Sequence, residues 1–155
     1  MLLDAAAFLE NFSDRNEFLD NLKENYPNKN HKFLIRYFRK KIPHGFSIAL
    51  TCDFLKEFDV AFSDLPKPDV HIKDTLIALF GYDDNYYNTE KKEYQCINDV
   101  QEITSIINNR LISESKSPIT VYQLDRMIWL ACTDNFFLDF SGNTKEPYLQ
   151  DIKNL

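Results

Sequence analysis

The chain has 155 residues, of which 44% are hydrophobic and 14% aromatic, so it is long enough to bury a core and too apolar to be intrinsically disordered. Its three glycines argue against an all-β fold built on many tight turns, and against a glycine-rich phosphate loop. The formal net charge of −6 excludes binding to nucleic acid through overall charge alone. Any such contact needs a local basic patch, or else the partner is a basic protein surface.

The cysteines and the apolar runs exclude further classes of protein. Cys52, Cys96 and Cys132 lie far apart without a C-x-x-C pair, which predicts buried free thiols and neither a metal site nor another cofactor. No apolar run approaches the roughly 20 residues that span a bilayer. The N-terminus also lacks the basic segment of a signal peptide. We expect a cytoplasmic protein that does not contact a membrane.

Helical signals begin at the N-terminus. The stretch from Leu2 to Phe12 predicts a first helix, and Ser13 is a good N-cap for a second helix that runs to about Asn25. Asp14 would lie in the first turn of that helix, where a negative charge is favourable. Pro27 then interrupts the helical pattern.

A third helix is predicted from His31 to Lys41, and its charges are unusual. Its apolar side should consist of Phe33, Leu34, Tyr37 and Phe38. The opposite face should carry Lys32, Arg36 and Lys40, with Arg39 beside them. Residues 32–41 contain five Lys/Arg and no acid, which is unique in this acidic chain. Two interpretations are open: a solvated helix face, or a surface that faces phosphate groups.

The segment that follows resembles a hairpin between two helices. Pro43, His44 and Gly45 turn the chain, and a core helix is expected from Phe46 to Phe58. Backbone N–H groups at the start of such a helix, together with its dipole, favour a phosphate oxygen. The expected donors are those of Gly45, Phe46 and Ser47. The alternative is a plain corner between two helices.

The rest of the chain also reads as helices and loops. Residues 59–68 form a loop, and Asp69 opens a helix that runs through Phe80. An exposed loop at 81–90 carries Tyr82, Tyr86 and Tyr87. Longer helices follow at 92–112 and 120–132, with one more turn at 134–140.

These patterns predict the fold class. No segment alternates with a period of two over the length of a strand, so the chain should be all-α. We expect one compact bundle of about six or seven helices in a single domain over residues 1–142, with a helix-hairpin-helix at 31–58. Residues 143–155 should form a frayed tail.

Two motifs resemble the helix-hairpin-helix DNA glycosylase superfamily, which contains endonuclease III and adenine DNA glycosylase. Ile42 and Pro43 match the start of the family hairpin, L-P-G-hydrophobic-G, and Gly45-Phe46-Ser47 falls where Gly-hydrophobic-Gly is expected. Asp69-Val70-His71-Ile72 is similar to the catalytic-Asp motif that follows at family-like separation. The resemblance covers about forty residues. It implies binding to the backbone of duplex DNA and a catalytic role for Asp69.

Departures from the family pattern limit what the resemblance implies. His44 is inserted in the hairpin, and Ser47 replaces the second glycine. Ile48, Ala49 or Leu50 stands where bifunctional members carry a nucleophilic lysine, so no lyase activity is implied. Only 41 residues precede Ile42, where the family has a helical subdomain of roughly a hundred residues.

The implied reaction is hydrolysis of an N-glycosidic bond of a modified base. That reaction builds positive charge on the sugar, which a fixed carboxylate stabilises. Asp69 would have this role, although an aspartate at this position is also an ordinary helix cap. A flipped base would need stacking partners, for which Tyr82, Tyr86 and Tyr87 are candidates if they do not pack on a neighbouring helix. Lys67 and Lys73 are candidate phosphate contacts.

Three functional hypotheses remain open from the sequence. The first is a monofunctional DNA glycosylase of base excision repair. The second is a non-catalytic DNA-binding module of the same lineage. The third is an acidic module that binds a basic protein, which the net charge of −6 favours and the acid-free stretch at 32–41 opposes.

Overall fold

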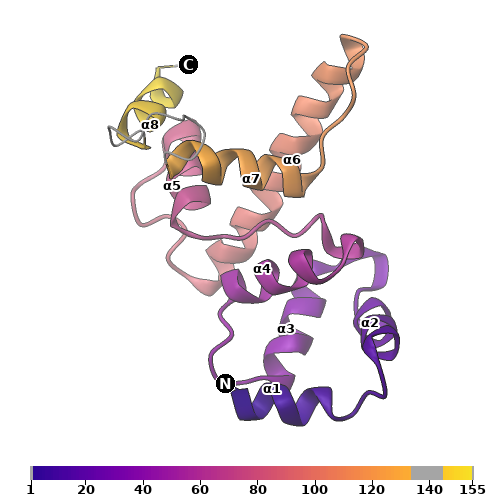
Figure 1. The fold of residues 1–155 in the computed structure, drawn as a ribbon. Coiled ribbons are helices and arrows are strands. Elements are labelled where there is room, and N and C mark those ends of the chain that lie inside the picture. Colours follow the sequence, from indigo (N-terminus) through magenta and orange to yellow (C-terminus); the bar gives the residue numbers. More distant parts are fainter. Residues whose placement is uncertain (1, 134–144, 155) are drawn as a thin grey trace. The chain divides into compact units, whose positions relative to one another are not determined.

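The computed structural model describes residues 2–133 and 145–154, and these residues are all-helical (Figure 1). No strand occurs within the described residues, so the predicted all-α class is confirmed. The described residues form eight α-helices: α1 (Leu2–Leu9), α2 (Arg15–Glu24), α3 (His31–Lys41), α4 (Ile48–Phe58), α5 (Val70–Phe80), α6 (Glu90–Ser113), α7 (Val121–Cys132) and α8 (Lys145–Lys153). Two short 3-10 turns are η1 (Pro27–Lys29) and η2 (Val60–Phe62).

The chain divides into two compact units, Met1–Leu65 and Pro66–Leu155, where the sequence predicts one domain over 1–142. The boundary falls within the predicted loop 59–68, at the first of its two prolines. We call these the first and second units and describe each by itself.

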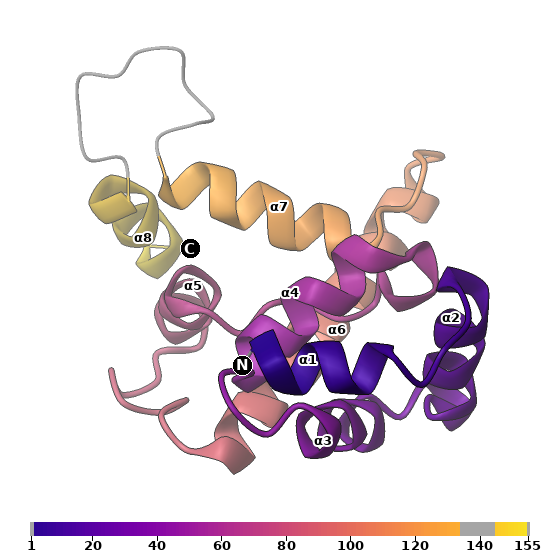
Figure 2. The same ribbon diagram turned by 60° about the horizontal axis from the view of Figure 1, so that its bottom comes forward.

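In the first unit, α1 contacts α3, α3 contacts α4, and α4 contacts η2 (Figure 2). Aromatic rings fill the space between these helices. Phe8 meets the rings of Phe18 and Phe38 edge-on, and Phe38 also packs on Phe54. Such edge-to-face pairs stabilise a core beyond the area that they bury.

Side-chain caps fix where the helices of the first unit begin. Asp14, and not Ser13, is the N-cap of α2, because its carboxylate accepts the N–H groups of Asn16 and Glu17. Ser13 instead donates its N–H and its hydroxyl to Glu17. Helix α4 starts at Ile48, two residues after the predicted start, because Ser47 caps it.

Helix α3 has the predicted bounds, but its buried side differs from the prediction. Leu34, Ile35 and Phe38 are buried. Phe33, which we expected on the apolar side, is 51% exposed. The reason is geometric: a helix turns 100° per residue, so a buried stripe centred on Leu34 and Phe38 takes in Ile35 and leaves Phe33 at its edge.

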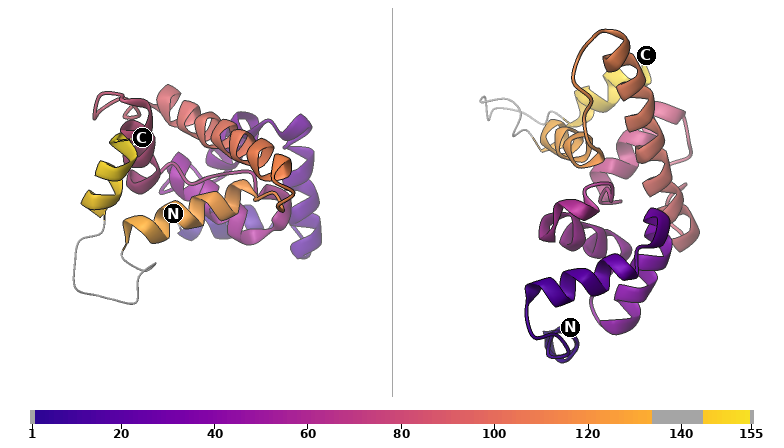
Figure 3. Two further views of the ribbon diagram at one scale, coloured as in Figure 1. Left: turned by 90° about the horizontal axis from the view of Figure 1, so that it is seen from above. Right: turned by 90° about the vertical axis from the view of Figure 1, so that its right-hand side faces the viewer.

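In the second unit, α5 contacts α6, α7 and α8, and α7 also contacts α6 and α8 (Figure 3). The core between them includes Ile72, Leu76, Val100, Leu124 and Ile128. Long helix α6 buries Tyr94, Ile97, Val100 and Thr104 among others.

Caps again set the helix ends of the second unit. Thr120 forms a capping box with Gln123 at the start of α7. Gly81 ends α5 in the left-handed conformation, with φ of 65°. The predicted end of the helix at Phe80 and the predicted helix start at 120 agree with these positions.

The ends of the second unit add two observations. Helix α8, which contacts α5, lies where the sequence predicts a frayed tail. The turn expected at 134–140 lies outside the described residues. The cysteines are free and buried, as predicted, and burial raises the pKa of the Cys96 thiol. Among the described residues, no helix combines the length and the apolar character needed to cross a bilayer.

Candidate nucleic-acid interface

The turn between α3 and α4 spans residues 42–47 in the first unit. Ile42 is buried and ends α3, and Gly45 has φ of 99°, a conformation that favours glycine. Ser47 caps α4 by accepting the N–H of Leu50 with its hydroxyl oxygen. This hydroxyl leaves the N–H groups of Ile48 and Ala49 in the first helical turn without a side-chain cap, but Ile48 is 1% exposed, so Ala49 is the more accessible of the two. The predicted donors at Gly45, Phe46 and Ser47 lie in the turn that leads into this helix, with Ser47 at its N-cap.

Two contacts hold the turn in place. Arg39 Nε donates to the Phe46 carbonyl oxygen at 3.1 Å. His44 Nδ1 lies 3.0 Å from Asp4 Oδ2, which ties the turn to α1, and this hydrogen bond lowers the pKa of Asp4. Arg39 therefore has a structural role in the hairpin besides its predicted contact with phosphate.

The basic face of α3 consists of Lys32, Arg36 and Lys40. All three are exposed, at four-residue spacing, on the side of the helix away from Leu34 and Phe38. Arg39, Lys40 and Lys41 form the last turn, where cations also stabilise the helix through its dipole. Both interpretations of the basic stretch agree with this exposure.

Asp69 lies in the second unit, as the N-cap of α5. Its Oδ1 accepts the N–H groups of His71 at 3.0 Å and Ile72 at 3.1 Å. Its Oδ2 is 3.9 Å from Lys67 Nζ, and the side chain is 18% exposed. Asp69 is thus an ordinary helix cap, as the sequence allows. The cap occupies one oxygen of the carboxylate, Oδ1.

The two lysines near Asp69 both face acids. Besides its ion pair with Asp69, Lys67 donates its backbone N–H to Asp125 at 3.2 Å. Lys73 Nζ lies 2.6 Å from Glu93 Oε1. A phosphate would have to compete with these carboxylates for both lysines.

The tyrosines of loop 81–90 pack together and on the core. The Tyr82 and Tyr86 rings stack at 3.9 Å, and Lys92 Nζ lies 3.5 Å from the Tyr86 ring centroid. Tyr87 is 1% exposed, and its hydroxyl donates to Asp99 at 2.7 Å. Tyr87 therefore presents no open ring face to a base, because its ring is part of the core. Tyr82 and Tyr86 are partly buried and pack against the same core. The sequence leaves open such packing as the alternative to stacking on a base.

The structure gathers the predicted residues into two groups. The hairpin residues Pro43 to Ser47 and the basic face of α3 lie in the first unit. The second unit contains Lys67 and Asp69 just before α5, Lys73 on α5, and the three tyrosines in the loop between α5 and α6.

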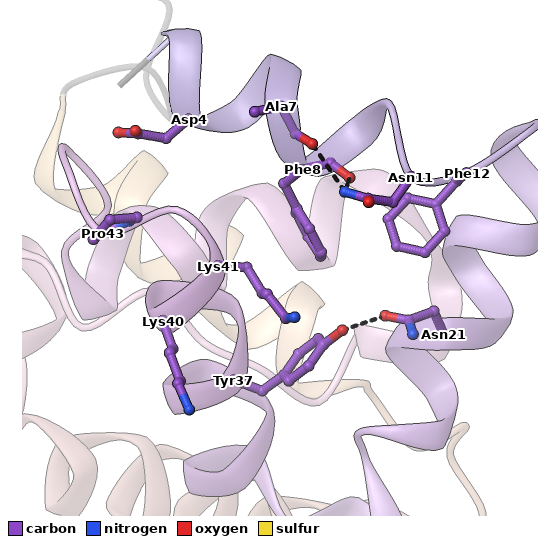
Figure 4. A pocket seen from close by; sticks show the side chains of 10 residues that line it. All are labelled: Asp4, Ala7, Phe8, Asn11, Phe12, Asn21, Tyr37, Lys40, Lys41 and Pro43. Carbon is purple, nitrogen blue, oxygen red and sulfur yellow. Dashed lines mark hydrogen bonds between the residues drawn. The ribbon is translucent and has the colours of Figure 1, made fainter.

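The first unit also contains a pocket that no sequence motif indicates. This pocket of about 580 Å³ opens among α1, α2 and α3, and Figure 4 shows its side chains. Phe8, Phe12 and Tyr37 give it aromatic walls, and Asn21, Lys40 and Lys41 give it polar groups. A second pocket of about 340 Å³ lies in the second unit and is lined by Asp74, Asp84, Glu146 and Lys153 among others. Asp69 lines neither of these two pockets.

No known protein-family model matches the chain, and no curated protein or solved structure is detectably similar to it. Within the described residues, no three His, Cys, Asp or Glu side chains gather as they would around a metal ion. The function is therefore inferred from the residues and their geometry.

Proposed function

We propose that this protein binds the backbone of DNA without sequence preference, through the basic face of α3 and the turn at 42–47. The supporting observation is the exposure of Lys32, Arg36 and Lys40 in a row on a helix whose other side is buried. The apolar side fixes how the helix is rotated, so the cations stay on one surface. The N-terminus of α4 adds N–H donors and a favourable dipole.

The distribution of charge supports this proposal. Residues 1–65 carry nine Lys/Arg and ten Asp/Glu, a net charge of −1, whereas residues 66–155 carry nine and fourteen, a net charge of −5. The acidic excess that opposes DNA binding therefore belongs almost wholly to the second unit. In the first unit, the acid-free run of α3 provides a local basic surface.

A salt titration of duplex binding tests the proposal. Fluorescence anisotropy with a labelled duplex should give an affinity that falls steeply with salt, and Arg36→Gln should reduce the slope by about 0.9 on a logarithmic scale if one phosphate contact is lost. Lys91→Gln is the matched control, because Lys91 is an exposed cation of α6 in the second unit. A salt-independent affinity, or equal losses in both variants, would refute the proposal.

Base excision is the stronger form of the proposal, and it needs Asp69. In that form, the protein is a monofunctional glycosylase in which the Asp69 carboxylate stabilises the cationic sugar. Duplexes that contain modified bases should then release free base, and Asp69→Asn should abolish the release while leaving affinity for DNA nearly intact. Release at the parental rate by the variant would remove Asp69 from the mechanism. Binding without release by the parent protein would leave the non-catalytic DNA-binding module.

The charge of the second unit favours one alternative, an acidic module that binds a basic protein. Asp83 and Asp84 are exposed in loop 81–90, and the unit has a net charge of −5. The salt titration separates this alternative from DNA binding, since an acidic module would not retain the duplex at any salt concentration.

A further inference from the structure

The pocket of the first unit combines two chemistries that suit one class of ligand. Figure 4 shows Lys41 extending between the Phe8 and Tyr37 side chains, with Lys40 on the same helix and Asn21 across the pocket on α2. Its volume of about 580 Å³ lies within the range of small-molecule sites.

The cations of the pocket favour an anion. Lys41 Nζ lies 5.6 Å from the Tyr37 ring centroid, and Lys40 lines the same pocket. Asp4 also lines the pocket, and its negative charge opposes an anion there. The lining thus carries two ammonium groups and one carboxylate, and His44 Nδ1 lies 3.0 Å from that carboxylate.

The other walls favour a planar ring with polar edges. Phe12 and Tyr37 both line the pocket and are half-buried. Tyr37 donates its hydroxyl to Asn21 Oδ1 at 2.6 Å, which fixes the amide and turns its Nδ2 group away from that bond. That N–H₂ is a donor suited to a ring nitrogen or carbonyl of a nucleobase.

We infer that this pocket binds a nucleotide, as an unpaired residue of a DNA strand. The phosphate would lie on Lys40 and Lys41, and the base would stack on Phe12 or Tyr37 and accept a hydrogen bond from Asn21. Aromatic rings interleaved with cations are the usual means of holding single strands. The inference depends on the proposed function in one respect, since the basic face of α3 shares Lys40 with the pocket and would lead the strand into it.

The test compares single strands with duplexes, using the intact chain and Asn21→Asp. Aspartate has the shape of asparagine and still accepts the Tyr37 hydroxyl, but it removes the donor and adds a negative charge. The matched control is Asn16→Asp, the same change at an exposed position of the same helix. Fluorescence anisotropy with labelled strands of equal length measures both affinities, and deoxyadenosine monophosphate serves as a competitor.

We expect single strands to bind more tightly than duplexes in the parent protein. Asn21→Asp should weaken single-strand binding about tenfold, which corresponds to about 1.4 kcal/mol, while duplex binding changes by less than about twofold. Asn16→Asp should bind both forms like the parent.

Three results would overturn the inference. The first is that Asn21→Asp leaves single-strand affinity unchanged. The second is that Asn21→Asp weakens single-strand and duplex binding equally. The third is that the mononucleotide binds as tightly as the strand. The first two would leave the proposed function standing if duplex binding still depends on Arg36. If the parent protein bound single strands but not duplexes, the proposed function would fail while the inference about the pocket would stand. The two failures are therefore distinguishable.

Discussion

The Asp69 carboxylate caps the N-terminus of α5. It receives two backbone N–H groups on Oδ1, which satisfies donors that α5 would otherwise leave open. A catalytic role would have to use Oδ2, which lies 3.9 Å from Lys67 Nζ. The structural and the catalytic roles therefore make different demands on the side chain, and substitutions separate them.

We predict that Asp69→Ala lowers the free energy of unfolding by about 1 kcal/mol, because alanine cannot cap α5. Asp69→Asn should cost less, since its amide oxygen accepts the same N–H groups. Urea unfolding followed by circular dichroism measures both changes. If alanine were as stable as asparagine, the cap would contribute nothing, and the geometry at Asp69 would need another explanation.

His31 should make stability depend on pH. Burial, with a smaller contribution from Lys32, lowers its pKa below the ordinary value of 6.5, and Asp64 opposes this shift. The unfolded chain then binds the proton more readily than the folded one, so the free energy of unfolding is greatest above pH 6.5 and falls as the pH decreases toward the folded-state pKa.

We predict that His31→Gln flattens this dependence between about pH 7.5 and 5.5, where the carboxylates of the chain stay largely ionised. Urea unfolding of the parent and the variant at several pH values measures it. A parent slope that survives the substitution would assign the pH dependence to another group.

At the scale of elements, loop 81–90 is anchored to α6 by a buried polar contact. The Tyr87 hydroxyl donates to Asp99 Oδ2, and Gln95 donates to Asp99 Oδ1, both at 2.7 Å. Asp99 is 6% exposed. If one donor is lost, a carboxylate oxygen is therefore left without a hydrogen bond, because water does not readily reach it. Burial and the contact with Asp99 also raise the pKa of Tyr87, which keeps the hydroxyl protonated as the donor.

We predict that Tyr87→Phe destabilises the protein by about 1–3 kcal/mol through the unsatisfied Asp99. Tyr122→Phe removes a hydroxyl from a half-buried tyrosine that accepts a longer bond of 3.3 Å from Arg126, and it should cost less. Thermal unfolding of the two variants provides the comparison. Equal losses would mean that burial of Asp99 is compensated by other groups.

Local signals predicted the elements well where a helix has its own cap. Asp69 and Thr120 mark the starts of α5 and α7, because a cap acts within four residues of sequence. Ser13 and Asp14 are both good caps, and only the competing bond of Ser13 to Glu17 decides between them.

Features that depend on residues far apart in the sequence could not be predicted from local patterns. The nucleotide pocket combines side chains of α1, α2 and α3, so its residues become neighbours only when the helices pack. Tyr82 and Tyr87 lie in the same loop, yet Tyr82 is half-buried, whereas Tyr87 is buried and donates a hydrogen bond to Asp99 of α6. Helix α8 depends on its contact with α5, which no local signal indicates.

At the scale of the whole molecule, the two units differ in charge, and this difference bears on DNA binding. The second unit, with a net charge of −5, adds a repulsive potential that acts over roughly a Debye length, about 10 Å at 0.1 M salt. The first unit, near neutrality, carries the basic face of α3. DNA affinity of the full chain is therefore expected to be a balance between local attraction and general repulsion.

We predict that the fragment 1–65 binds a DNA duplex at least as tightly as the whole chain at low salt, and that 66–155 does not bind. The repulsive charge is removed in the first fragment, whereas the second lacks the basic face of α3. A domain of this size is only marginally stable, so circular dichroism must first show that 1–65 is helical. A helical 1–65 fragment that fails to bind, or binding by 66–155, would place the DNA contact outside α3. An advantage of 1–65 that disappears at high salt would identify electrostatic repulsion as its cause, because screening weakens exposed charges over distance.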